Sequence, residues 1–143
     1  MKGFGWVFVF CLLVSTASAQ KPSDPVLKSA QLPTYPVLAR TAGVVGDMDA
    51  EFTLDSEGNV TSVEITSGHP LLKRVTEENI RTWKFKLPTE GGMDGRRFKT
   101  RFSYKLSGRW VPESKVPKLT VTFDSFDHVE ITSDQQGEPT IRD

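Results

Sequence analysis

The sequence predicts an α+β domain in which one main helix packs on one face of a small antiparallel β-sheet. Residues 46–54 and 97–106 alternate apolar and polar side chains, which is typical of half-buried strands. Residues 70–83 instead carry apolar side chains at helical spacing. A short Gly-containing segment joins the first strand to a second one at 59–67, and this favours an antiparallel hairpin.

The N-terminus has the pattern of an exported protein. Lys2 supplies a charged start, residues 6–14 form a short apolar run, and the small residues at 17–19 fit a cleavage site. A helix that crosses a membrane needs about 20 apolar residues, so the run favours a signal peptide over residues 1–19. An uncleaved membrane anchor is the alternative.

Composition restricts the class of protein that follows this signal. The chain of 143 residues is long enough for one domain. Its single cysteine, Cys11, lies in the predicted signal, so the mature protein has no disulfide and no thiol chemistry. The 18 Lys and Arg side chains balance the 18 Asp and Glu side chains, which argues against a nucleic-acid-binding surface. Residues 20–34 are polar and contain proline, and we interpret them as a linker.

The first predicted strand has one apolar and one acidic face. Its inner face carries Met48, Ala50, Phe52 and Leu54, and its outer face carries Asp47, Asp49, Glu51 and Thr53. Gly58 can take positive φ in the turn that follows. In the second strand, Val60 is out of phase with Val63 and Ile65, which predicts a bulge or an edge contact.

The helix is predicted to begin at Pro70, because proline at the first helical position loses no hydrogen bond. His69 precedes it and is interpreted as a capping or turn residue. Trp83 lies on the apolar face, and Glu77 and Arg81 form a favourable pair one helical turn apart. The helical pattern therefore closes near Trp83.

A basic and aromatic strand at 97–106 follows the helix. Its alternation turns Phe98, Phe102 and Tyr104 towards the core. After it, residues 119–123 and 128–132 predict an added C-terminal hairpin within an extension that spans 107–143, and residues 134–143 are a polar tail.

No set of residues predicts catalysis. His69 and His128 are far apart in the sequence, and neither belongs to a zinc-binding pattern. The acidic row at Asp47, Asp49 and Glu51 is interpreted as a solvated strand face rather than a calcium site. We therefore predict a protein that is not an enzyme and that needs no cofactor and no metal.

Several short motifs occur in a recognisable order between residues 35 and 106. They are Tyr35-Pro36 with Ala39-Arg40, the turn at Asp55 to Gly58, Ser67-Gly68-His69-Pro70-Leu71-Leu72, and Trp83 with Phe85. In this order and spacing, residues 35–106 resemble the TonB C-terminal domain family. The resemblance implies a β-β-α-β core that works in the periplasm.

The resemblance also implies partners. Well-known members of the family link an ExbB–ExbD motor to outer-membrane receptors, and the N-terminal peptide of the receptor adds as a strand beside the last strand of the domain. An open strand edge favours this mode of binding. The implied partner-binding residues are Tyr35, Pro36, Arg97, Lys99, Arg101, Ser103 and Lys105.

We therefore expect a periplasmic docking protein of transmembrane transport. One alternative is a minimal energy transducer, anchored by its apolar N-terminus and coupled to an ExbB–ExbD-type motor. A second alternative is a structural or self-associating envelope module, such as a homodimer. The added hairpin can pair with the last family strand, and it would then block the usual docking edge.

Overall fold

The computed structural model describes residues 24–89 and 95–137. The predicted signal peptide at 1–19 lies outside these residues. Within the described ranges, no helix is both long enough and apolar enough to cross a membrane.

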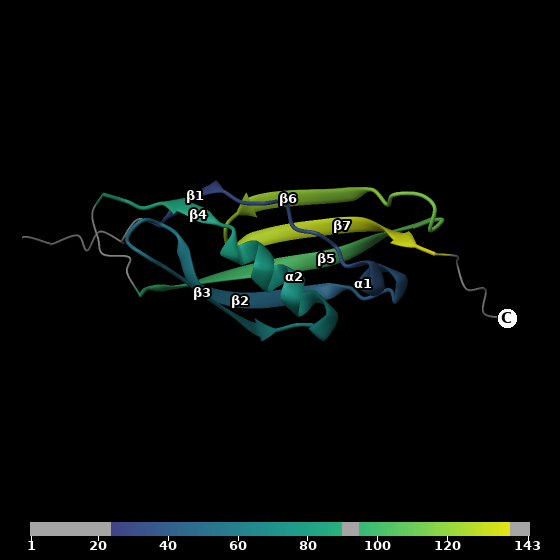
Figure 1. Ribbon diagram of the computed structural model, residues 1–143, viewed down its shortest axis with the longest axis horizontal. Helices are drawn as coiled ribbons and strands as arrows, with labels where there is room; N and C mark the ends of the chain where they lie inside the picture. Colours follow the sequence, from purple (N-terminus) through teal and green to yellow (C-terminus); the bar gives the residue numbers. More distant parts are fainter. Residues whose placement is uncertain (1–23, 90–94, 138–143) are drawn as a thin grey trace, which may run out of the picture.

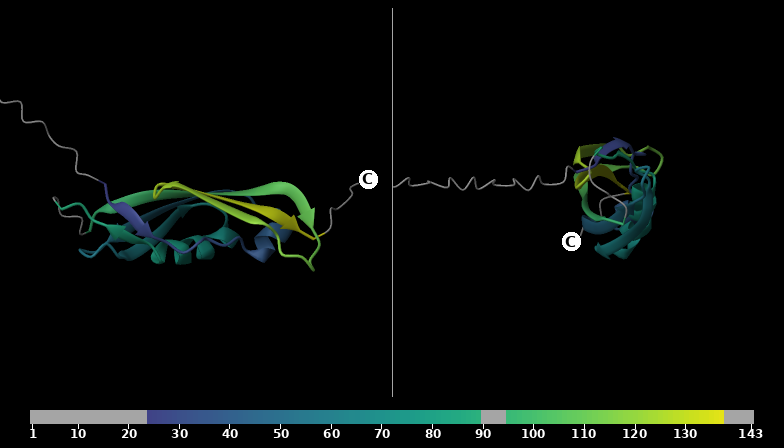
Figure 2. Two further views of the ribbon diagram at one scale, coloured as in Figure 1. Left: turned by 90° about the horizontal axis from the view of Figure 1, so that it is seen from above. Right: turned by 90° about the vertical axis from the view of Figure 1, so that its left-hand side faces the viewer.

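The described chain forms two layers, a five-stranded sheet and a layer of helices that covers one face of it (Figures 1 and 2). A separate two-stranded sheet, β1 with β4, lies on the helix side (Figure 2). The elements are β1 (Val26–Ser29), α1 (Val37–Thr41), β2 (Gly46–Leu54), β3 (Val60–Ser67), α2 (Pro70–Arg81), β4 (Lys84–Lys86), β5 (Arg97–Val111), β6 (Leu119–Ser125) and β7 (His128–Gln136). The larger sheet has the order β3-β2-β5-β7-β6. The predicted α+β fold with one main helix and an added hairpin is confirmed.

The β2–β3 hairpin forms where the sequence predicts it. Gly58 has a φ of +84°, and a Cβ at this position would lie 2.0 Å from the carbonyl oxygen of Phe85. The carboxylate of Asp55 accepts hydrogen bonds from the backbone N–H groups of Glu57 and Asn59 at 2.9 and 2.8 Å. The register shifts beside Val60, which confirms the predicted bulge.

Helix α2 begins at Pro70, and His69 caps it. The His69 Nδ1 atom accepts a hydrogen bond from the backbone N–H of Leu71 at 3.2 Å. The helix ends at Arg81, and the chain then enters the short strand β4 rather than continuing the helix. The capping role predicted for His69 is therefore confirmed.

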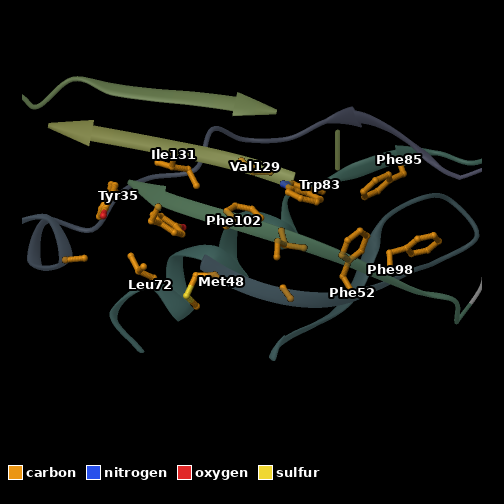
Figure 3. Close-up of a cluster of buried hydrophobic side chains, with 14 of the residues drawn as sticks. Tyr35, Met48, Phe52, Leu72, Trp83, Phe85, Phe98, Phe102, Val129 and Ile131 are labelled. Atoms are coloured by element: carbon orange, nitrogen blue, oxygen red, sulfur yellow. The ribbon is translucent and has the colours of Figure 1, made fainter. Parts of the chain in front are cut away.

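Aromatic side chains fill the space between α2 and the sheet (Figure 3). Trp83 stacks on Phe102 with ring centroids 5.7 Å apart, and Phe52 meets Trp83 edge-on at the same distance. The Trp83 Nε1 donates to the Asn79 side-chain oxygen at 3.0 Å, and the Asn79 amide donates to the Gln31 carbonyl at 2.8 Å. These two bonds satisfy buried polar groups and tie the helix to the segment before α1.

That segment differs from the linker predicted at 20–34. Part of it is strand β1, which pairs antiparallel with β4, and Pro33 is fully buried. Proline and polar residues reduce the strand signal here, but β4 supplies backbone partners that local composition does not reveal.

The sheet also differs from the predicted antiparallel one, because β7 runs parallel to β5. After β5 the chain skips one strand position, forms β6 and returns as β7 between them. β7 extends to Gln136, so the predicted polar tail begins later than expected.

Candidate partner-binding surfaces

Strand β5, the docking edge implied by the resemblance, is an internal strand. On one side it pairs with β2 along Arg97 to Tyr104. On the other side β7 covers it from Arg101 to Val111. From Arg101 onwards the implied docking edge is therefore occupied, and the expected alternative, in which the added hairpin pairs with this strand, is the one that the structure has. The added hairpin supplies the backbone groups that an external peptide would otherwise supply. Residues 97–100 of β5 have no partner strand on this side among the described residues.

The basic residues of β5 form ion pairs across the outer face of the sheet. Arg101 Nε lies 2.7 Å from the Asp49 carboxylate, and Arg97 and Lys99 lie 3.1 and 3.7 Å from Glu51. Hydrogen bonds from Arg101 hold the pKa of Asp49 below its ordinary value. The acidic row of β2 is thus paired with β5. Exposed pairs of this kind contribute about 0–1 kcal/mol each.

Two further predicted binding residues of β5 also have intramolecular partners. Ser103 is buried, and its hydroxyl donates to Asp47 at 2.7 Å and lies 3.2 Å from His128 Nε2. Lys105 Nζ lies 2.5 Å from the Glu130 carboxylate of β7. These contacts link β5 to the strands on either side of it.

The Tyr35-Pro36 step lies at the start of α1 and does not present its tyrosine to solvent. Tyr35 is 3% exposed, and its ring meets Tyr104 edge-on at 5.2 Å. Its hydroxyl donates to the Val44 carbonyl, and burial raises its pKa. Pro36 directly precedes the first helical residue of α1. The contacts of Tyr35 are those of a core residue.

The five-stranded sheet ends on each side at a strand without a further partner strand among the described residues, and these two outermost edges belong to β3 and β6. On β3, Val63 and Ile65 are half-buried, while Ser62 and Glu64 are exposed. The carboxylate of Glu64 lies 3.5 Å from Arg97 of β5. The β3 edge therefore combines free backbone groups with a row of partly accessible apolar side chains.

The outer edge of β6 also combines half-buried apolar side chains with exposed polar ones. Val121 and Phe123 are half-buried against the core, whereas Thr120 and Thr122 are exposed on the outer face. An open apolar groove of about 540 Å³ adjoins the end of this strand. It lies between Asp24 to Leu27 and Phe123 to Asp127. The sequence does not reveal this edge, because alternation of apolar and polar residues does not tell which strand of a hairpin is outermost.

In the part of the chain that the structure describes, no group of three or more His, Cys, Asp and Glu side chains could hold a metal ion. Burial raises the pKa of Tyr104 to about 12, but this hydroxyl lies in the core, 2.9 Å from the Thr76 hydroxyl. The accessible features are backbone edges and surface charges, which suit protein binding.

Comparisons with known proteins identify relatives of the central part of the chain. Residues 31–106 match the family described as Gram-negative bacterial TonB protein C-terminal. The chain is similar to Protein TonB of Yersinia enterocolitica, with 30% identity over 73 residues, which is 50% of this chain and 29% of that protein. It is also similar to a solution NMR structure of the Pseudomonas aeruginosa TonB CTD, with a TM-score of 0.49 and 23% identity over 59% of this chain and 88% of that one.

Proposed function

Because the chain belongs to the TonB C-terminal family, we propose that it is a periplasmic protein-binding domain that docks on outer-membrane receptors of transport. The single observation that supports this most is the family match over 31–106, which contains α1, β2, β3, α2, β4 and most of β5. The family is one of envelope transport and not of enzymes. The signal predicted at residues 1–19 supports export to the periplasm.

The receptor contact is an extended N-terminal peptide that adds as a strand to the outer edge of β3. Of the two outermost edges of the five-stranded sheet, only that of β3 lies within the family match. Its unpaired N–H and C=O groups provide backbone hydrogen bonds to such a peptide. Val63 and Ile65 provide accessible apolar surface for alternate side chains of the added strand.

Binding to a receptor does not require that the protein also binds a motor in the inner membrane. The chain spans 29% of the length of the TonB relative it matches. We propose that the exported domain binds receptors without driving them itself. The alternative is an anchored protein that binds an ExbB–ExbD-type motor, and an intact mass of the protein in the membrane fraction that includes residues 1–19 would favour it.

Site-specific cross-linking of the exported protein tests the docking edge. Because the sequence after residue 19 has no cysteine, Ser62→Cys on β3 and Thr122→Cys on β6 each introduce a single thiol. Both replace exposed hydroxyl residues on the outer face of an edge strand. The probe is a synthetic N-terminal peptide of an outer-membrane TonB-dependent receptor from the same organism, carrying one cysteine.

We expect the peptide to bind both variants and to form a disulfide with Ser62→Cys only. Cross-linking to Thr122→Cys alone would overturn the assignment to β3 while leaving receptor binding intact. If titration calorimetry detects no binding of any receptor peptide from the organism, the proposed function itself is wrong.

A further inference from the structure

The outer edge of β6 has backbone groups that point away from the sheet. The C=O of Lys118 accepts a hydrogen bond from the Asp134 N–H at 3.0 Å, so Lys118 faces β7 with its backbone. Hydrogen-bonded and non-bonded pairs alternate along an antiparallel ladder. Thr120 and Thr122 therefore also bond towards β7, and the N–H and C=O groups of Leu119, Val121 and Phe123 point outwards.

Between Leu119 and Phe123, this edge lacks the features that usually prevent edge-to-edge pairing. Such features include a proline, a bulge or a charged side chain within the strand. Residues 119–123 have the sequence Leu-Thr-Val-Thr-Phe, in which β-branched and aromatic residues favour pairing. The β6–β7 register shifts only after Phe123. The edge is thus regular over the length needed for a new strand pair.

The charges that flank this stretch are complementary under a two-fold rotation. Lys118 lies three residues before Val121, and Asp124 lies three residues after it. Lys118 lies on the exposed outer face, because side chains alternate along the strand and Thr120 and Thr122 lie on that face. Asp124 lies at the register shift after Phe123, and its contact with His128 of β7 places it on the same face. The side chain of Asp124 is 70% exposed and lies 3.1 Å from His128.

We propose that β6 is a self-association site, at which a second copy of the chain pairs antiparallel through its own β6 with the two-fold axis at Val121. This pairing places Lys118 opposite Asp124 of the second copy, and the reverse pair repeats across the axis. Leu119 then lies opposite Phe123 of the second copy, so apolar side chains meet on the helix side of the sheet. Cross-strand pairs of both kinds stabilise sheets.

The backbone supports the same register. With the axis at Val121, the outward groups of Leu119, Val121 and Phe123 face the outward groups of the second copy, which allows about six hydrogen bonds. An axis at Thr120 would place Lys118 opposite Thr122, and an axis at Thr122 would place it opposite Phe126. Both alternatives lose the two ion pairs, so the charges select the axis at Val121.

The β3 edge does not offer an equivalent self-pairing. Its strand contains one acidic residue, Glu64, and no basic residue. No two-fold axis within β3 can therefore pair opposite charges, and an axis at Glu64 would oppose two carboxylates. The charge pattern thus distinguishes β6 from β3 as the site for a second copy.

Charge exchange tests the pairing on the exported full-length protein. Lys118→Asp places acidic residues at both ends of the stretch, and Asp124→Lys places basic residues at both ends. Each variant alone then opposes like charges across the axis twice, and we expect self-association at least about tenfold weaker, since repulsion replaces attraction at two pairs. Mixed in equal amounts, the two variants regain both opposite-charge pairs as a heterodimer.

Sedimentation velocity and light scattering read out the association. Glu64→Lys on the β3 edge is the matched control, and we expect it to associate like the wild-type protein. Three results would overturn the proposal: a wild-type monomer up to millimolar concentration, dimers that both single variants retain at wild-type strength, or a mixture that associates no better than its components. The mixture also guards against misfolding, because a misfolded variant cannot restore a heterodimer.

Discussion

Replacing Ile131 with alanine tests whether β7 is part of the core or a removable cap on β5. Ile131 is 0% exposed and lies in register between Tyr104 of β5 and Val121 of β6. Truncation of a fully buried isoleucine removes apolar contacts and leaves a cavity, at a cost of about 2–5 kcal/mol. The whole domain should lose this amount, because the same side chain contacts the central sheet.

Denaturant unfolding followed by the fluorescence of the buried Trp83 measures the free energy of unfolding. Thr132→Ala is the matched control, since Thr132 is the next residue of β7 but is only half-buried. We expect the control to change stability by less than about 1 kcal/mol. If Ile131→Ala is no more destabilising than Thr132→Ala, β7 is a loosely held cap, and the β5 edge becomes available to a receptor peptide.

Three further predictions concern the core and its turns. Asn79→Ala leaves the Trp83 N–H and a backbone carbonyl without partners, and should cost about 1–3 kcal/mol in urea unfolding. Gly58→Ala forces a Cβ against the Phe85 carbonyl at positive φ. The substitution should lower the free energy of unfolding by at least about 1–3 kcal/mol, and thermal unfolding should show a lower midpoint. The raised pKa of Tyr104, about 12, means that the folded state holds this proton more tightly than the unfolded state. The protonated hydroxyl therefore contributes to the free energy of unfolding below about pH 10, and this contribution is lost as pH rises towards about 12. Unfolding measured over a pH series should show the free energy of unfolding decline in this range, and Tyr104→Phe should reduce the decline.

The elements that local pattern determines could be predicted from the sequence. β2 has the predicted bounds, because its alternation matches one buried and one solvated face. Helix α2 begins at the predicted Pro70, because proline and the His69 cap are local signals. The bulge beside Val60 could also be predicted, because Val60 is out of phase with Val63 and Ile65 and this change of phase is a local signal.

Strand neighbours could not be predicted in the same way. Residues 97–106 alternate whether the strand is at an edge or in the centre of a sheet, because alternation reports faces and not lateral partners. The parallel partner of β5 comes from residues 128–136, beyond an intervening strand. The burial of Tyr35 likewise depends on its contact with Tyr104, a residue far along the chain.

The added hairpin moves a strand edge of the sheet without removing it, because only closure into a barrel eliminates edges. A sheet that ended at β5 would be open at β3 and β5, whereas the sheet that includes the hairpin is open at β3 and β6. These two edges are the two lateral ends of the same sheet, and four strand spacings of about 4.8 Å each separate them. A receptor peptide at β3 and a second copy at β6 therefore do not compete for backbone groups. We expect the dimer dissociation constant to stay unchanged when β3 is saturated with receptor peptide, and a measured competition would show that both ligands use one edge.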